Sequence, residues 1–150
     1  MLSNTRTKPM EVLLVEDGLM DARVTIHALR RSGVHHRLTL VRRIDEAIQF
    51  LNRETIFARA PRPDLLLLDV NLPDGTGIDV LDAIGSLQLK ITTVMLSASD
   101  NADIRQRCEE YDVNDFITKP VDEDKFLRVV REHKRLMIHS TPLLAQTISS

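Results

Sequence analysis

The sequence lacks the features that mark secreted, membrane-spanning and nucleic-acid-binding proteins. Cys108 is its only cysteine, which excludes an internal disulfide and fits a reducing compartment. No stretch approaches the roughly 18 apolar residues of a membrane span, and residues 1–9 are polar, without the apolar core of a signal peptide. A net charge of −2 gives no sign of a DNA-binding domain. These absences predict a cytoplasmic protein that binds neither membrane nor DNA.

What the chain does contain is a regular alternation of two kinds of segment. Short segments suited to β-strands alternate with segments whose apolar residues have helical spacing. The expected strands are Val12–Val15, Arg37–Val41, Leu65–Leu68, Ile91–Leu96 and Phe116–Thr118. Asp45 and Asp122 are expected to cap the second and the last helix, and the last helix is expected to reach Met137. Five strands alternating with five helices predict one domain with a doubly wound α/β fold.

Charged residues stand directly after three of the expected strands. Glu16 and Asp17 follow the first, Asp69 follows the third and Lys119 follows the fifth. Bare apolar runs are typical of strands buried on both faces of a parallel sheet. Ligand sites in open α/β sheets lie at the carboxyl ends of such strands. If these strands are neighbours, three carboxylates and one ammonium meet in one crevice, which suits a divalent cation and a phosphoryl group.

Each of these residues has a chemical role that fits such a crevice. Magnesium binds carboxylate oxygens, so Glu16, Asp17 and Asp69 are candidate ligands. Asp69 is also a candidate nucleophile that would form an aspartyl phosphate. Lys119 and the hydroxyl of Ser97, at the end of the fourth strand, would contact phosphate oxygens. Taken singly, each is an ordinary turn, cap or surface residue; their shared position at strand ends favours function.

The acid pair, central aspartate, hydroxyl and Lys-Pro, in this order, resemble the receiver domain of two-component response regulators. The resemblance covers roughly residues 10–138 and implies a flavodoxin-like sheet with strand order 2-1-3-4-5. It leaves residues 1–9 as a disordered lead and 139–150 as a C-terminal tail.

The resemblance also implies a role for each site residue. Asp17 would bind Mg²⁺ directly, Glu16 would assist through water, and Asn71 would give its backbone carbonyl. Asp69 would bind the metal and accept phosphate from a sensor histidine kinase. Such a protein is a phospho-accepting signalling protein, with no enzymatic activity beyond its own phosphotransfer and autodephosphorylation.

The output switch follows from the same resemblance. Ser97 and Lys119 would contact the phosphoryl oxygens, and Phe116 would be the aromatic side chain that rotates on phosphorylation. Ala98 is small and would leave room for the phosphate and for that rotation. Ser97 and Phe116 together would change the surface that binds a partner.

A finer resemblance involves the segment before the central aspartate. Ala60-Pro61-Arg62-Pro63-Asp64, leading into Leu-Leu-Leu-Leu-Asp-Val-Asn-Leu-Pro, is similar to the small stand-alone regulators paired with bacterial and cyanobacterial phytochromes. It implies a phytochrome as one candidate for the kinase. Tyr111-Asp112-Val113 departs from the usual Leu-Gly-Ala, so Asp112 is expected to adopt a backbone angle that glycine takes at lower cost.

Two other functions stay open. A phosphorelay intermediate would pass the phosphate onward instead of switching a surface. A phosphohydrolase of the haloacid-dehalogenase type also uses an aspartate nucleophile with magnesium. That type carries its Asp-x-Asp on the first strand, whereas Asp69 follows the third, and Asn71 cannot supply the second aspartate's proton. A receiver that only binds proteins is disfavoured by the intact acid set.

The end of the chain predicts a homodimer. Phe126 and Val130 are needed by the core, whereas Val129 and Leu136 are expected to point elsewhere. Met137 and Ile138 would continue this apolar surface, as would the apolar residues of the tail, Pro142, Leu143, Leu144 and Ile148. Two-fold pairing is the commonest way to cover such a surface, with the tail as a dimerisation arm. The alternative is a disordered tail after Ser140.

Overall fold

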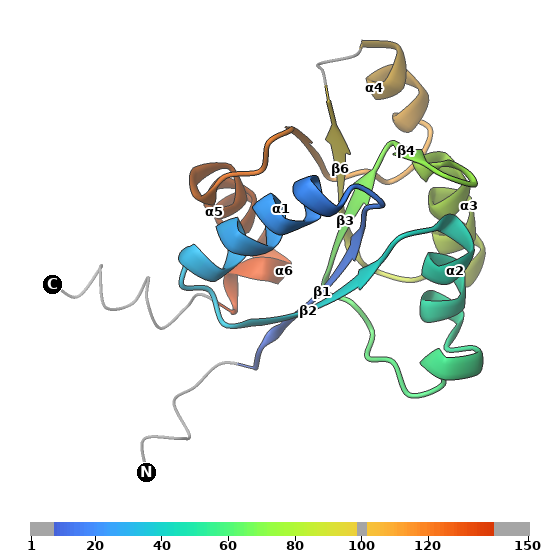
Figure 1. Ribbon diagram of the computed structural model, residues 1–150, viewed down its shortest axis with the longest axis horizontal. Helices are drawn as coiled ribbons and strands as arrows, with labels where there is room; N and C mark the ends of the chain where they lie inside the picture. The colour runs from blue at the N-terminus through green and yellow to red at the C-terminus, as the bar shows by residue number, and fades with distance from the viewer. Residues whose placement is uncertain (1–7, 99–101, 140–150) are drawn as a thin grey trace, which may run out of the picture.

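The computed structural model describes residues 8–98 and 102–139. A parallel sheet of five strands runs through its centre, in the order β2-β1-β3-β6-β7 (Figure 1). The strands are β1 (Met10–Val15), β2 (His36–Val41), β3 (Leu65–Asp69), β6 (Thr92–Ser97) and β7 (Asp115–Thr118). Without the short strands β4 and β5, this is the order 2-1-3-4-5. The predicted doubly wound, flavodoxin-like fold is confirmed.

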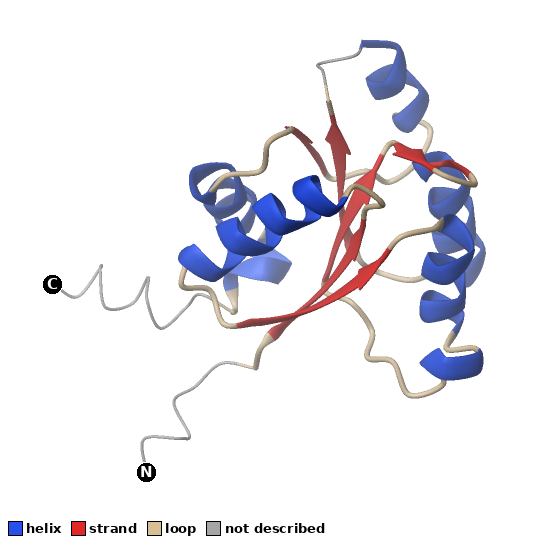
Figure 2. Cartoon of the chain, in the orientation of Figure 1, coloured by secondary structure: helices blue, strands red, loops and turns tan. Residues whose placement is uncertain are grey.

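Helices cover both faces of the sheet (Figure 2). One face carries α1 (Leu19–Arg31), α5 (Glu123–Glu132) and α6 (Lys134–Met137); the other carries α2 (Ile44–Asn52), α3 (Gly77–Leu87) and α4 (Ala102–Cys108). A 3₁₀ turn, η2 (Thr55–Phe57), follows α2. Among the helices of the described ranges, none combines the length and apolar character needed to cross a membrane.

The central strand β3 supplies both hydrophobic cores. Leu65 and Leu67 pack toward α1 and α5, whereas Leu66 and Leu68 pack toward α2 and α3, because successive side chains of a strand face opposite ways. All four leucines are fully buried. Burying one leucine contributes about 1.5–3 kcal/mol. The strand is therefore firmly held, and so is Asp69 at its carboxyl end.

The loop after β3 folds back as a small antiparallel hairpin of β4 (Asn71–Leu72) and β5 (Gly75–Thr76). Its tip contains Asp74, whose carboxylate accepts hydrogen bonds from the backbone N–H groups of Ile44 and Asp45. The N-cap residue of α2 is Arg43, whose side chain makes no capping bond, so Asp74 caps the helix in its place and the predicted cap by Asp45 is wrong. The predicted cap of α5 by Asp122 is confirmed, since its carboxylate accepts from the Lys125 N–H.

The predicted last helix is two helices in the structure. His133 has extended backbone angles (φ −121°, ψ 110°), so α5 ends at Glu132 and α6 begins at Lys134. This break gives six α-helices among the described residues, one more than the five predicted. The His133 ring reaches back to β7, where its Nε2 lies 3.0 Å from Asp115 Oδ2. A tertiary contact therefore accompanies the end of α5.

Two of the apolar residues predicted to form the dimer surface are buried within this chain. Val129 and Leu136 are 0% exposed and pack in the same core as Phe126, so the prediction that they point elsewhere is wrong. The extra helix α6 is what turns Leu136 inward. Met137 is half-buried, and Ile138 is 61% exposed. Residues 1–7 of the predicted lead 1–9, and the apolar tail residues from Pro142 onward, lie outside the described residues.

Candidate functional site at the carboxyl edge of the sheet

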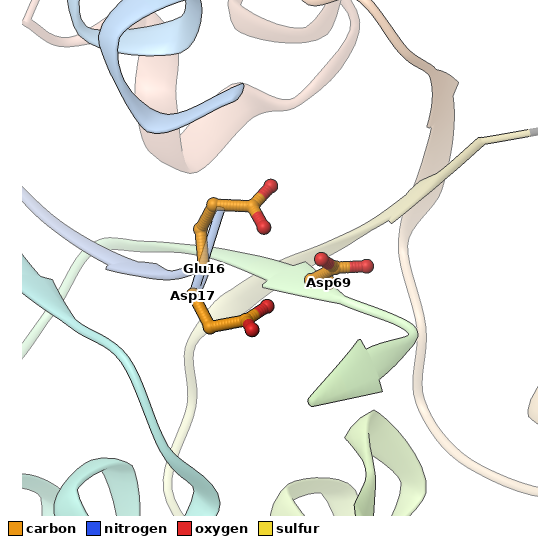
Figure 3. A group of neighbouring side chains, drawn as sticks. All are labelled: Glu16, Asp17 and Asp69. Carbon is orange, nitrogen blue, oxygen red and sulfur yellow. The ribbon is translucent and has the colours of Figure 1, made fainter. Parts of the chain in front are cut away.

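Glu16, Asp17 and Asp69 lie together where β1 and β3 end (Figure 3). The two strands are neighbours, and Val15 pairs with Leu68, which brings the residue after β1 level with Asp69. One carboxylate oxygen from each acidic residue lies within 4.8 Å of the others. Figure 3 shows the Glu16 and Asp17 side chains extending toward Asp69. The structure thus brings the three sequence-selected carboxylates into one cluster.

Lys119 reaches the same cluster from β7. Ser97 pairs with Thr118, and the Lys119 N–H donates to the Ser97 carbonyl over 2.7 Å, which fixes the lysine beside the end of β6. Its Nζ lies 2.7 Å from Glu16 Oε1 and donates to Asp69 Oδ2 over 2.9 Å. The Lys119 side chain is only 13% exposed. One ammonium therefore faces several carboxylates in a nearly closed space.

The negative charge of the cluster is only partly neutralised. Burial raises the pKa of Glu16 to about 7, with Asp69 adding to the effect and Lys119 opposing it. Burial works against the charge of Lys119, but Glu16 and Asp69 outweigh it and raise the lysine's pKa. The contact between Lys119 and Glu16 Oε1 is an ion pair without hydrogen-bond alignment, so this buried oxygen keeps a lone pair for another cation.

The Asp69 carboxylate is held by neighbours on both of its oxygens. Oδ1 accepts the Asn71 N–H over 3.2 Å, and Oδ2 accepts Lys119. Gly77 passes so close behind it that a Cβ there would lie 2.7 Å from the Asp69 carbonyl oxygen. Only glycine permits this approach, which the Gly77 N–H bond to the Val70 carbonyl maintains. The loop thus fixes the aspartate from two sides.

The donor set of the cluster fits a hard divalent cation. Three carboxylates are available, one of them with a buried oxygen that makes no aligned hydrogen bond. Magnesium and its relatives prefer such oxygen ligands and retain waters and phosphate oxygens as the others. Asn71 begins β4 and adjoins the cluster through its bond to Asp69. The residues present therefore fit the metal that the sequence predicts.

The two residues predicted to form the switch lie on β6 and β7: Ser97 is the last residue of β6, and Phe116 is the second residue of β7. Ser97 is half-buried and Ala98, the next residue, is exposed. Asp69 pairs with Leu96 on the neighbouring strand, so Ser97 follows directly after the partner of Asp69. Phe116 is half-buried, and the Arg105 guanidinium of α4 lies 4.7 Å from its ring centre. The Phe116 ring therefore lies against α4 in this structure, and a change in its orientation would reach that helix directly.

Two contacts at the site were not predicted from the sequence. Lys119 Nζ also donates to Asp21 Oδ2, over 3.2 Å, from the first turn of α1. The Arg42 guanidinium donates to the Asp17 carbonyl oxygen over 2.8 Å. The available signal for Asp21 was an acidic residue in the first turn of the helix that directly follows the acid pair.

Residues 12–131 match the sequence model of the family described as "Response regulator receiver domain". The chain belongs to this family. The receiver fold, the order of motifs and the acidic cluster agree with that membership. The predicted resemblance is confirmed, and the chain is a receiver-domain response regulator.

This receiver is similar to the response regulators Rcp1 and RcpA. It is 32% identical to "Response regulator Rcp1" of Synechocystis sp. over 146 residues, covering 96% of this chain and 99% of the relative. A solved "Phosphorylated Cyanobacterial Phytochrome Response Regulator RcpA" is 37% identical with a TM-score of 0.72, covering 83% of this chain and 91% of that one. A solved "Mn(2+)-bound form of response regulator Rcp1" is 37% identical with a TM-score of 0.70, covering 81% and 89%.

Proposed function

We propose that this receiver accepts a phosphoryl group on Asp69 from the phosphohistidine of a phytochrome-type sensor histidine kinase. The observation that carries the proposal is the position of Asp69 at the centre of the site, between two other carboxylates and the Lys119 ammonium. No other acid that the structure describes is the last residue of a central strand of the sheet. The phytochrome partner is supported by the printed names of the relatives.

In the proposed transfer, a carboxylate oxygen of Asp69 attacks phosphorus and forms an O–P bond. The N–P bond to the kinase imidazole breaks, and its electron pair returns to the ring nitrogen. Lys119 is placed to bind a phosphoryl oxygen, since it already bonds to Asp69 Oδ2. Ser97, the last residue of β6, and Ala98 after it are proposed to contact the phosphoryl group from the other side. No proton needs to leave Asp69, because its carboxylate acts in the ionised form.

Mg²⁺ is the proposed metal, held by Glu16, Asp17, Asp69 and the Asn71 carbonyl. When bound, it supplies positive charge against the phosphoryl oxygens. The buried Glu16 oxygen and the small spacing of the carboxylates support this ligand set. The Mn²⁺-bound relative agrees with a divalent ion in the family.

Signalling is proposed to follow from Ser97 and Phe116 rather than from turnover of a substrate. The Arg105 guanidinium lies over the Phe116 ring, and Arg128 of α5 donates to the Phe116 carbonyl over 3.3 Å. Phosphate drawn toward Ser97 would therefore bias a surface formed by α4, β7 and α5. A phosphorelay role uses the same chemistry and differs only in whether a second histidine accepts the phosphate.

Phosphotransfer from a labelled histidine kinase tests the proposed function. Wild-type receiver should take label in the presence of Mg²⁺, and Asp69→Asn or an excess of chelator should abolish it. Labelled Asp69→Asn, or labelling at the wild-type rate in chelator, would overturn the proposal. A phytochrome kinase should transfer faster than an unrelated kinase at equal concentration. Transfer of the label to a histidine phosphotransfer protein would favour the phosphorelay role. Rapid release of free phosphate would favour the phosphohydrolase.

A homodimer through the C-terminal end is also proposed, with a location in the cytoplasm. Support for the dimer among the described residues is now limited to exposed Ile138 and half-buried Met137. The cytoplasmic location is supported by the free thiol of Cys108. Light scattering at tens of micromolar, an assumed range for a moderate interface, should show a dimer. A monomer for both the full chain and a chain cut after His139 would rule the dimer out.

A further inference from the structure

Asp21 makes a contact that the proposed chemistry has not yet used. It is the third residue of α1, whose N-terminal cap is Gly18. An acidic side chain at this position commonly accepts the backbone N–H of the cap residue. Here that N–H donates instead to Glu16 Oε2, over 3.2 Å. The Asp21 carboxylate is thereby available for another partner, and Lys119 Nζ donates to it over 3.2 Å.

The three carboxylates around Lys119 differ in depth. The side chains of Glu16 and Asp69 are 1% and 9% exposed, whereas that of Asp21 is 55% exposed. The ammonium has three N–H donors and three acidic neighbours. Asp21 therefore holds it from the solvent side, opposite the buried pair. Without Asp21, both remaining acidic partners would pull the ammonium inward.

We propose that Asp21 is a positioning residue, which holds the Lys119 ammonium at the outer side of Asp69, where an incoming phosphoryl group first arrives. This inference rests on the proposed function. When the O–P bond forms, charge moves from the Asp69 carboxylate to the phosphoryl oxygens, farther out. A cation already held at that level needs little rearrangement, so its contribution to the transition state is larger.

The test compares rates of aspartyl-phosphate formation from acetyl phosphate at saturating Mg²⁺. Asp21→Ala should lower the maximal rate about three- to tenfold, the range expected for one partly exposed charged contact, with the half-saturating donor concentration unchanged. Asp21→Glu should recover most of the rate. Asp124→Ala is the matched control, because Asp124 is an exposed first-turn aspartate of α5 and gives the same change of charge.

A double variant separates positioning from a general effect on folding or charge. In a Lys119→Ala background, Asp21→Ala should change the rate by less than about twofold. The inference is overturned if Asp21→Ala behaves like Asp124→Ala, or if its full effect persists without Lys119. A wild-type receiver that takes no phosphate on Asp69 would overturn the proposed function and this inference together. Wild-type labelling with an inert Asp21 would overturn this inference alone.

Discussion

Glu16, directly after β1, and Asp115, on β7, are two largely buried carboxylates with opposite surroundings. Asp115, at the start of β7, accepts hydrogen bonds from both terminal nitrogens of Arg128, over 2.9 and 3.1 Å, with the His133 ring 3.0 Å away. Glu16 shares a single ammonium with Asp21 and Asp69. Asp115 thus has a guanidinium bound to both of its oxygens. Glu16 shares one ammonium with two other carboxylates.

The difference is visible in the pKa values. Burial tends to raise the pKa of Asp115, but Arg128 and His133 outweigh it and lower the pKa overall. For Glu16 burial prevails and raises the pKa to about 7. The Asp115 carboxylate has matched cationic partners within the protein, and removing it would leave them unpaired. Glu16 has too few cations, which is typical of a site that binds another one. The balance of charge therefore separates two clusters. The structural cluster is Asp115 with Arg128 and His133. The functional cluster is the set of carboxylates around Lys119, namely Glu16, Asp17 and Asp69.

The largest expected effect on stability comes from the structural cluster. Asp115→Ala leaves Arg128 and His133 without their shared partner and should lower the free energy of unfolding by about 2 kcal/mol, after allowance for the partial exposure of Arg128. Urea unfolding measures this change. Labelling by acetyl phosphate should stay within about twofold of wild type. A loss no larger than that of the exposed control Asp124→Ala would remove the contrast between the clusters.

The functional cluster should respond in the opposite direction. Glu16→Gln keeps the shape of the side chain and removes a charge with too few partners. In chelator at about pH 8, the variant should therefore be more stable than wild type by about 1 kcal/mol. Saturating Mg²⁺ should reverse the order, because only wild type has the full ligand set. Thermal unfolding of both proteins in both conditions is the measurement. Wild type more stable than Glu16→Gln in chelator would contradict the comparison.

The stability that Asp115 contributes should also be lost in acid. The pKa of Asp115 is lowered from 3.8 in the folded state, so the unfolded state binds more protons near and below that pH. Its contribution to stability is complete above that range and is lost as the pH falls through the folded value. The advantage of wild type over Asp115→Asn should thus shrink by about 1 kcal/mol from about pH 6 to about pH 3. An advantage that stays constant in urea titrations would count against the assignment.

The smallest expected effect on stability comes from the contact at Phe116, which lies between the two clusters. This residue lies on β7 between Asp115 and Lys119, with Arg105 over its ring. Arg105→Ala should cost only about 0.5 kcal/mol, as for an exposed cation–π contact. It should nevertheless change the aromatic NMR signals of Phe116 in the unphosphorylated protein. Signals identical to wild type would mean that Arg105 does not restrain the ring.

The main features of the fold and site could be predicted because their signals are local. The bare leucine run of β3 indicates a buried parallel strand, and charges after such runs indicate a ligand edge. The strand order came from the resemblance to receiver domains, and the local signals predicted that Glu16, Asp17, Asp69 and Lys119 converge if their strands are neighbours, as the structure shows. None of these features depends on a distant contact for its recognition.

The features that were missed depend on contacts between distant segments. Asp74 caps α2 from 30 residues away, which no local pattern near Asp45 reveals. The end of α5 at His133 has neither proline nor glycine to announce it, and its ring contact lies on β7. Asp112 was expected to need a glycine-like angle, but the non-glycine residues with positive φ among those described are Arg53, Thr55 and Gln88. The loop at Asp112 therefore follows a different path from the one assumed.

The most direct test of the account is to locate the phosphoryl group itself. Wild-type receiver would be treated with acetyl phosphate and Mg²⁺, reduced with borohydride to convert an aspartyl phosphate to homoserine, digested and analysed by mass spectrometry. The account predicts homoserine at position 69, with Glu16, Asp17, Asp21 and Asp115 unmodified and no conversion in chelator. Homoserine at another aspartate with position 69 intact, or an unmodified chain after full treatment, would contradict the central claim.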